Sequence, residues 1–297
     1  MRLTRTADSL TVLCPAKLNL FLEVRGRRPD GYHEIDTVMH AVTLYDTLVF
    51  RPLERRGIDF ACSDPDLADP AGNLVCRAAD LVARTCGLPA GVAIRLEKRI
   101  PVGAGLGGGS SDAAGALAGL NELFGLALGR DQLRRLAEQL GSDVPFFLYG
   151  GTARCRGRGE KVTPVPANLT LHCVVCCPPG RLSTAAVYQN LARLGLTTGN
   201  RSASVILDSL AQGNLASLRA ALFNRLDEAA VSLAPEIGRA KTRLAEATEL
   251  RPLVSGSGAA VYTIVESEER ATEAAEQMRA RGTARVFLVR TESPAQA

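Results

Sequence analysis

Hydrophobic and polar positions alternate like β-strands over the first 60 residues of the chain. Thr11–Val24, Glu34–His40 and Thr43–Arg51 are rich in Val, Leu, Thr and Phe, and Arg28-Pro-Asp-Gly supplies a turn between the first two. A further apolar run, Val92–Leu96, has the length of a strand. The pattern therefore predicts at least four strands in the first third of the chain.

Helical spacing of apolar positions follows in three segments. Asn73–Cys86 places Leu74, Ala78, Leu81 and Val82 on one face and meets a natural stop at Gly87. We predict two more helices, over Asp112–Phe124 and Asp131–Leu140.

The second half mixes the two periodicities. We predict strands at Leu171–Cys177, near Leu253, at Ala260–Val265 and at Ala284–Val289, and helices at about 202–212, 214–223 and 235–248 and at Ser267–Arg281. A passage rich in Gly and Pro separates the halves between residues 155 and 170. The pattern indicates an α+β protein with two domains, 1–160 and 161–297.

Composition and charge narrow the class of protein. The chain has 297 residues, 46% of them hydrophobic, and a net charge of +4 from 35 basic and 31 acidic residues. This composition excludes a disordered chain, and the small charge argues against nucleic acid as a partner. The pattern contains no apolar run long enough for a membrane helix and no secretory signal. We therefore expect no membrane partner and a cytoplasmic location.

Eight cysteines lie mostly in apolar runs, which is typical of reduced cysteines that pack as small hydrophobic residues. Cys173 and Cys176 form a CxxC pair, but a zinc site needs two further ligands and no second CxxC exists. We interpret the pair as part of a buried strand and predict no metal ligands in the chain.

A glycine-rich segment lies between a predicted strand and a predicted helix. Residues 101–112 read Pro-Val-Gly-Ala-Gly-Leu-Gly-Gly-Gly-Ser-Ser-Asp. Glycines permit close approach to the backbone, and a helix start offers unpaired N–H groups, so the segment suits the phosphates of a nucleotide. Ser110 and Ser111 would cap the helix or bind phosphate. The flanking residues fit neither a Walker loop nor a dinucleotide fingerprint. The alternative to a phosphate-binding loop is a flexible turn with a serine cap.

Pro101–Ala114 resembles the phosphate-binding motif of the GHMP small-molecule kinases. Other segments resemble further motifs of this superfamily in the same order: Pro15-Ala-Lys-Leu-Asn-Leu, Arg28-Pro-Asp-Gly-Tyr-His-Glu, Gly141-Ser-Asp-Val-Pro-Phe-Phe and Ser255-Gly-Ser-Gly-Ala. The resemblance spans nearly the whole chain. It implies the two-domain GHMP kinase fold, with an N-terminal ribosomal-protein-S5-like domain and a C-terminal α/β sandwich domain.

The resemblance also implies an activity and a set of site residues. The expected reaction is ATP-dependent phosphorylation of a hydroxyl group on a cytidine diphosphate sugar alcohol, with Mg²⁺ accompanying ATP, by a monomer or weak homodimer. Asp143 would be the general base, aided by Lys17. ATP would lie against Asn73, Pro101, Val102, Gly103, Ala104, Gly105, Leu106, Gly107, Gly108, Gly109, Ser110, Ser111 and Asp112. The substrate would contact Asn19, Tyr32, His33, Arg158, Thr184 and Tyr188.

Six of these residues also have a simpler interpretation from the sequence alone. Asp143 and Asn73 fit helix N-caps, and Lys17 fits an exposed strand face. Arg158 fits a charged turn between two glycines, and Tyr32 with its neighbour His33 fits an ordinary loop.

Lys98, one of only four lysines, either reaches the nucleotide or ends a strand in solvent. Asp112, Ser111 and Asp143 are the candidate neighbours of Mg²⁺, although ATP and water can supply most of its ligands.

Three other functions compete with this expectation. A GHMP kinase for homoserine or mevalonate would have no nucleobase for Tyr32 and His33 to stack on. A catalytically dead nucleotide-binding protein of the same fold would not need both Lys17 and Asp143. A nucleic-acid binder is disfavoured, since aromatic residues make up only 4% of the chain.

Overall fold

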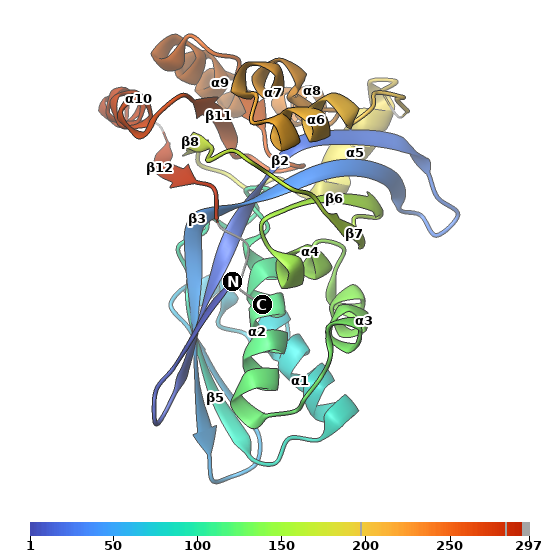
Figure 1. The fold of residues 1–297 in the computed structure, drawn as a ribbon, viewed down its shortest axis with the longest axis vertical. Helices are drawn as coiled ribbons and strands as arrows, with labels where there is room; N and C mark the ends of the chain where they lie inside the picture. The colour runs from blue at the N-terminus through green and yellow to red at the C-terminus, as the bar shows by residue number, and fades with distance from the viewer. Residues whose placement is uncertain (197, 283, 293–297) are drawn as a thin grey trace.

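The computed structural model describes residues 1–196, 198–282 and 284–292; the end of the predicted second domain, 293–297, lies outside the described residues. Figure 1 shows an elongated molecule with a long sheet and its helices in the lower half and a layer of helices over a second sheet in the upper half. Arg2 in the first strand pairs with Glu292, at the end of the described residues, with Arg2 Nε 3.0 Å from Glu292 Oε1. Strands β2 and β3 run the length of the larger sheet and carry their connecting turn into the upper half.

Eight strands of the described part of the chain form the larger sheet. β1, β2, β3, β5 and β4 lie side by side in that order, β6 and β7 extend the sheet from β3, and β9 pairs with β2. Their bounds are β1 Arg2–Arg5, β2 Leu10–Arg27, β3 His33–Leu53, β4 Ile58–Cys62, β5 Gly91–Glu97, β6 Thr152–Gly157, β7 Lys161–Pro164 and β9 Phe223–Asn224.

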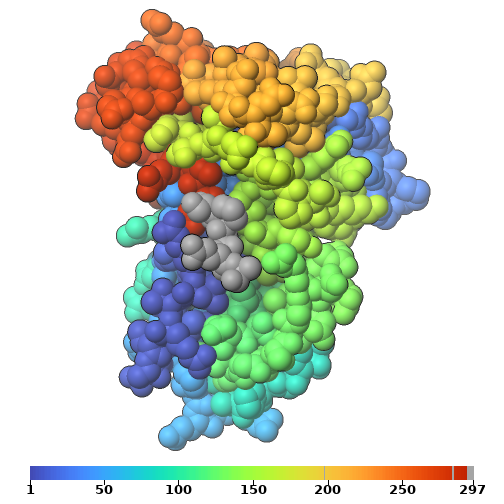
Figure 2. Space-filling view, in the orientation of Figure 1, coloured from blue at the N-terminus to red at the C-terminus, as the bar shows by residue number. Residues whose placement is uncertain are grey.

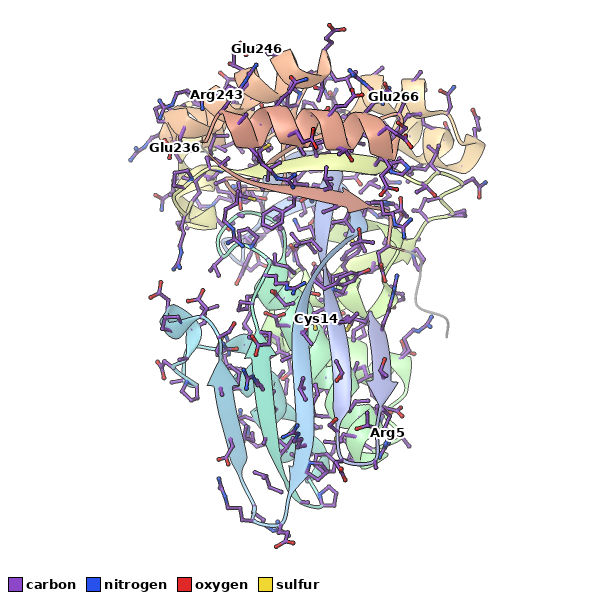
Figure 3. The ribbon with its side chains drawn as sticks, turned by 90° about the vertical axis from the view of Figure 1, so that its left-hand side faces the viewer. Arg5, Cys14, Glu236, Arg243, Glu246 and Glu266 are labelled. Atoms are coloured by element: carbon purple, nitrogen blue, oxygen red, sulfur yellow. The ribbon has the colours of Figure 1, made fainter. Side chains whose placement is uncertain are left out.

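Four helices cover one face of the lower part of this sheet. They are α1 Leu74–Cys86, α2 Gly108–Phe124, α3 Arg130–Leu140 and α4 Val144–Tyr149, and their apolar faces share one core with β2, β3 and β5. A short 3-10 turn, Pro65–Leu67, precedes α1. Figure 3 views the sheet from its strand side and shows Cys14, in the first part of β2, near the middle of the molecule. This cysteine is fully buried, and burial raises the pKa of its thiol well above the usual value.

The smaller sheet has the order β10-β11-β8-β12 and is antiparallel. Its strands are β8 His172–Cys177, β10 Leu253–Val254, β11 Val261–Val265 and β12 Arg285–Arg290. The helices of this half are α5 Thr184–Arg193, α6 Ser204–Gln212, α7 Leu215–Ala221, α8 Asp227–Leu233, α9 Pro235–Thr248 and α10 Glu268–Ala280. Figure 2 shows the β2–β3 turn protruding beside the α5 region, so the two halves interlock there.

Strand β8 is buried on both faces, which explains its continuous run of apolar residues. Cys173 packs in the core shared with β2, while Cys176 packs on the opposite face, against α9 and α10. The strand interpretation of the CxxC pair is confirmed, and the two sulfur atoms lie on opposite sides of the sheet. Burial raises the pKa of each thiol to about 12.

Most predicted elements are present, and the differences have physical causes. Glu34–His40 and Thr43–Arg51 are one continuous strand, β3, because irregular pairing with β2 lets the chain bend without breaking the sheet. The helices α5 and α8 and the edge or bridging strands β1, β4, β6, β7 and β9 were not predicted, since each is too short or too irregular to show a period. The start of α4 agrees with the N-cap alternative for Asp143. The mixed α+β class is confirmed.

Candidate active site

A cavity of about 1120 Å³ lies where the two halves meet. Its wall includes parts of β2, the β2–β3 turn, the starts of α1 and α2, the segment before α4, and α5. Every site residue predicted from the sequence lines this cavity except Ser111, which is fully buried behind it. The fold therefore gathers in one place residues that are spread from position 17 to position 188 of the chain.

The glycine-rich segment forms one edge of the cavity, and it differs from the prediction at its end. Helix α2 begins at Gly108, four residues before the predicted Asp112, and its N-cap is Gly107 with φ 73°. Ser110 and Ser111 lie inside the first turn, so the prediction that they cap the helix is wrong. Glycine at the N-cap adopts the left-handed conformation at no steric cost. The first N–H groups of an α-helix have no intrahelical partner, which leaves this end suited to an anion.

A second glycine segment, Ser255–Gly258, packs directly against the first. Ser255 Oγ donates a hydrogen bond of 3.1 Å to the carbonyl of Gly105, and the Ala260 amide donates one of 3.0 Å to the carbonyl of Ala104. A methyl group added to Gly105 would lie 2.0 Å from the Ser255 carbonyl oxygen, and one on Gly258 would lie 1.9 Å from the Gly105 nitrogen. The two backbones touch, so only glycine fits at either position.

Lys17, Asn19 and Asp143 form a polar group on the floor of the cavity. Lys17 Nζ lies 3.6 Å from Asp143 Oδ2 and donates a short hydrogen bond to Asn19 Oδ1. Asn19 Nδ2 in turn donates to Thr37 Oγ1 at 2.9 Å, which fixes the amide orientation. Lys17 is only 3% exposed, so the alternative of an exposed strand face is wrong. A buried ammonium requires a partner of opposite charge, and Asp143 supplies it.

The backbone places Asp143 so that its carboxylate stays available. Asp143 occupies the N-cap position of α4, but its side chain makes no capping hydrogen bond there. Its side chain is 29% exposed, and Gly159 lies beside it, where an added methyl group would be 3.4 Å from Asp143 Oδ1, an ordinary contact. A partly exposed carboxylate beside a buried ammonium can accept a proton from a hydroxyl group while the neighbouring charge steadies the oxygen left behind.

Aromatic rings form the opposite wall. His33 stacks on Tyr188 of α5 with ring centroids 4.4 Å apart, and the guanidinium of Arg158 lies 4.8 Å from the ring centroid of Tyr32. Tyr32 is 52% exposed. Burial, and to a smaller extent Arg27, lowers the pKa of His33, so its imidazole is neutral at pH 7. A neutral imidazole beside stacked rings suits a flat, uncharged heterocycle.

The remaining predicted residues frame the entrance. Asn73 caps α1, since its Oδ1 accepts from the Val75 amide at 2.9 Å, and it still lines the cavity. Thr184, at the start of α5, shares a hydrogen bond of 2.9 Å with Ser257 Oγ. Residues 101–107 and Gly108–Ser110 line the adjacent edge together with Asp112.

Four residues of the wall were not among the predicted site residues: Ser142, Gln189, Gly256 and Ser257. Three of them, Ser142, Gly256 and Ser257, lie in segments that carry the family resemblance. Gly256 is the most informative, because a methyl group there would lie 3.2 Å from Lys17 Nζ and 3.1 Å from Asn19 Oδ1. The Ser-Gly-Ser-Gly repeat was the available signal for Gly256 and Ser257. Gln189 has no sequence signal, since it enters the site only through the packing of α5.

Family models match both halves of the chain: the GHMP kinases N terminal domain over residues 73–151 and the GHMP kinases C terminal domain over residues 206–284. A 4-diphosphocytidyl-2-C-methyl-D-erythritol kinase from Pelotomaculum thermopropionicum is 43% identical, over 96% of this chain and 99% of the relative. The chain belongs to the 4-diphosphocytidyl-2-C-methyl-D-erythritol kinase family of GHMP kinases. A second such kinase, from Symbiobacterium thermophilum, is 42% identical over 91% of this chain and 95% of its own.

Solved structures agree with this membership. A crystal structure of 4-(cytidine 5'-diphospho)-2C-methyl-D-erythritol kinase superimposes with a TM-score of 0.81 at 40% identity, covering 95% of this chain and 100% of that one. Homoserine kinase from Cytophaga hutchinsonii superimposes with a TM-score of 0.76 at 20% identity, covering 100% and 98%, which shows the shared fold alone. The predicted GHMP kinase fold is confirmed, and the protein is a small-molecule kinase of this family. Among the described residues no helix is long and apolar enough to cross a membrane.

Proposed function

We propose that this kinase transfers the γ-phosphate of ATP to the 2-hydroxyl of 4-diphosphocytidyl-2-C-methyl-D-erythritol, giving the 2-phosphate and ADP, in the non-mevalonate pathway of isoprenoid biosynthesis. The single observation that carries the proposal is the arrangement of one cavity. A backbone anion cradle, a Lys17–Asp143 pair and an aromatic wall at Tyr188 line the same space. Phosphoryl transfer requires mainly alignment and charge neutralisation, and these parts supply both.

ATP phosphates bind at Pro101–Gly109 and the first turn of α2, and adenine lies toward Asn73. The open end of α2 and the tight packing of Gly105 on Ser255–Gly258 support this assignment. Rigid N–H donors bind phosphate without a further ordering cost.

Asp143 accepts the proton of the substrate hydroxyl as that oxygen attacks the γ-phosphorus. Lys17 holds the carboxylate ionised before the reaction and steadies the developing alkoxide. The 3.6 Å separation between Lys17 Nζ and Asp143 Oδ2 supports this pairing, since a hydroxyl oxygen beside the pair can lie within hydrogen-bond distance of both atoms. Asn19 orients Lys17 through their shared hydrogen bond.

The cytidine base binds at the wall formed by Tyr32, His33 and Tyr188, and Arg158 meets the diphosphate. The ring stacking of His33 on Tyr188 supports a site for a flat base, and the guanidinium beside Tyr32 supplies charge near the exposed end. Thr184 supports the sugar side through its contact with Ser257.

Mg²⁺ enters with ATP and neutralises phosphate charge when bound. Within the described ranges, no group of three or more His, Cys, Asp or Glu side chains is arranged to hold a metal ion. Of the residues considered from the sequence, Asp143 offers a partly exposed carboxylate in the cavity, and Asp112 also lines it. Ser111 Oγ and Asp112 Oδ1 are buried without a hydrogen-bond partner among the described residues. The residues therefore fit an ion held mainly by ATP phosphates and water, with these three side chains as its candidate protein neighbours.

We further propose that residues 1–160 and 161–297 act as two units that meet at the active site. They are firmly joined, because β7 pairs with β6, β9 pairs with β2, and Thr291 bridges to Val42. A cytoplasmic monomer or weak homodimer stays our expectation for the form in which the enzyme works.

An ADP-release assay tests the proposed substrate. Equal concentrations of 4-diphosphocytidyl-2-C-methyl-D-erythritol, homoserine and mevalonate are compared with ATP and Mg²⁺. We expect turnover with the cytidine substrate alone. Preferred turnover of homoserine or mevalonate would overturn the substrate assignment.

A further inference from the structure

A cluster of three charged side chains lies at the base of the loop Pro101–Gly107. Lys98 Nζ is 2.7 Å from Asp112 Oδ2 and also forms a short ion pair with Asp46 Oδ2. The side chains of Lys98, Asp112 and Asp46 are 6%, 3% and 0% exposed. The alternative of a solvated strand end for Lys98 is therefore wrong. Charges so far from water depend on one another for stabilisation.

The cluster joins segments that are far apart in sequence. Asp46 lies in β3, Lys98 follows the end of β5, and Asp112 is the fifth residue of α2. Asp46 Oδ1 also accepts hydrogen bonds from the amides of Arg99 and Ile100, the latter at 2.9 Å. The residues just before the phosphate loop and the helix just after it are thus tied to one strand.

The two ends of the loop pack closely against each other at Gly108 and Ile100. A methyl group added to Gly108 would lie 3.0 Å from Ile100 Cγ2 and 3.3 Å from Asp46 Oδ2. The loop spans these fixed ends, and its other side packs on Gly258. Lys98 and Asp112 line the cavity beside it.

Two carboxyl groups share one ammonium in the cluster. Burial raises the pKa of Asp112 to about 8; Lys98 opposes this shift and Asp46 adds to it, so Asp112 can hold a proton and bring the cluster close to neutrality. The ammonium of Lys98 is held between the two carboxyl groups. This leaves the backbone of the loop, and not Lys98, as the group that meets phosphate.

We infer that Lys98, with Asp46 and Asp112, is a positioning residue of the phosphate loop. It fixes the separation between the two ends of the loop and so holds the N–H groups of Gly103–Gly109 ready for the nucleotide. The inference rests on the proposed function, since it requires the nucleotide to bind at this loop. Pre-organised donors bind more tightly because less ordering accompanies binding.

Calorimetric titration of ADP and of CMP, both in EDTA so that no metal ion contributes, tests the inference. Lys98→Met removes the ammonium while keeping the length of the side chain. We expect ADP affinity to fall at least ~10-fold, the scale of one lost hydrogen bond to a charged group. We expect CMP affinity to change less than about twofold, as for a remote substitution.

Lys241→Met is a matched control, because Lys241 forms a comparable part-buried ion pair with Asp227 in the other half of the molecule. We expect it to lower thermal stability and to leave ADP affinity unchanged. A second pair of variants, at Asp112, tests the inference if Lys98→Met fails to fold. Asp112→Asn keeps an oxygen for Lys98 and should weaken ADP binding less than Asp112→Ala does.

The outcomes separate the inference from the proposed function. If the unaltered protein binds no ADP either in EDTA or with Mg²⁺ added, the proposed function fails. If it binds ADP and folded Lys98→Met binds ADP equally well, the inference is overturned and the proposed function stands. Equal ADP affinities of Asp112→Asn and Asp112→Ala would also overturn it, as would a loss of stability in Lys98→Met with ADP affinity unchanged.

Discussion

The contact between the two glycine segments makes a quantitative prediction for Gly105→Ala. The new methyl group would lie 2.0 Å from the Ser255 carbonyl oxygen, whereas ordinary contacts begin at 3.4 Å, so the backbones must separate by about 1.4 Å. A displacement near 1 Å in a positioning group can cost about 100-fold in rate. We therefore expect kcat/KM for ATP to fall about 100-fold. The assay is steady-state ADP release with the cytidine substrate held saturating.

Gly125→Ala is the matched control for backbone strain. Gly125 has φ +59°, close to the +78° of Gly105, but an added methyl group there meets nothing within 4 Å. Both variants bear a left-handed conformation that costs about 1–2 kcal/mol of stability. Only Gly105→Ala should lose activity beyond about twofold. A Gly105→Ala enzyme with unchanged kcat/KM for ATP would refute the claim that this contact shapes the phosphate site.

Three further changes test other parts of the account. Asp143→Asn should lower kcat at least ~100-fold, the scale for a lost general base, and should keep its ADP affinity. Normal turnover would contradict that role, and Asp131→Asn, at an exposed carboxylate, is the control. Tyr188→Ala removes one stacked ring, so it should raise KM for the cytidine substrate about 10-fold and leave KM for ATP unchanged. An equal rise in the two KM values would point to misfolding. Buried His40, whose pKa is lowered by burial from 6.5 to about 4, stays neutral in the folded state, whereas the unfolded chain gains a proton below pH 6.5. The free energy of unfolding should therefore fall by up to about 3 kcal/mol between pH 6.5 and 4, and denaturant titrations of His40→Gln should lack this part of the slope.

The sequence predicted those parts of the site whose local pattern is strong. The glycine run at 101–112, the strand bearing Lys17 and the Pro-Asp-Gly turn before Tyr32 all carry signals within a few residues, and each lines the cavity. The start of α2 was misplaced, because three consecutive glycines have low helix propensity and hide a helix that tertiary packing stabilises. The helical first turn is what changes Ser110 and Ser111 from caps into helix residues.

Long-range packing explains what no local pattern could reveal. Lys98 reads as a polar strand end, and only the fold brings Asp46 and Asp112 onto its ammonium. The stacking of His33 on Tyr188 likewise joins the start of β3 to a helix residue 155 positions later. The small number of lysines in the sequence singled out Lys98. Its role could not be predicted, because it depends on partners that become neighbours only after folding.

The central claim is that phosphate is transferred to the 2-hydroxyl of the cytidine substrate in this cavity. The most direct measurement is phosphorus NMR, with proton coupling, of the product formed from ATP and 4-diphosphocytidyl-2-C-methyl-D-erythritol. The account predicts one new phosphomonoester signal, assigned to the 2-oxygen, appearing in step with ADP and nearly absent with Asp143→Asn. A phosphate on another oxygen, or ADP release with inorganic phosphate and no ester, would contradict it.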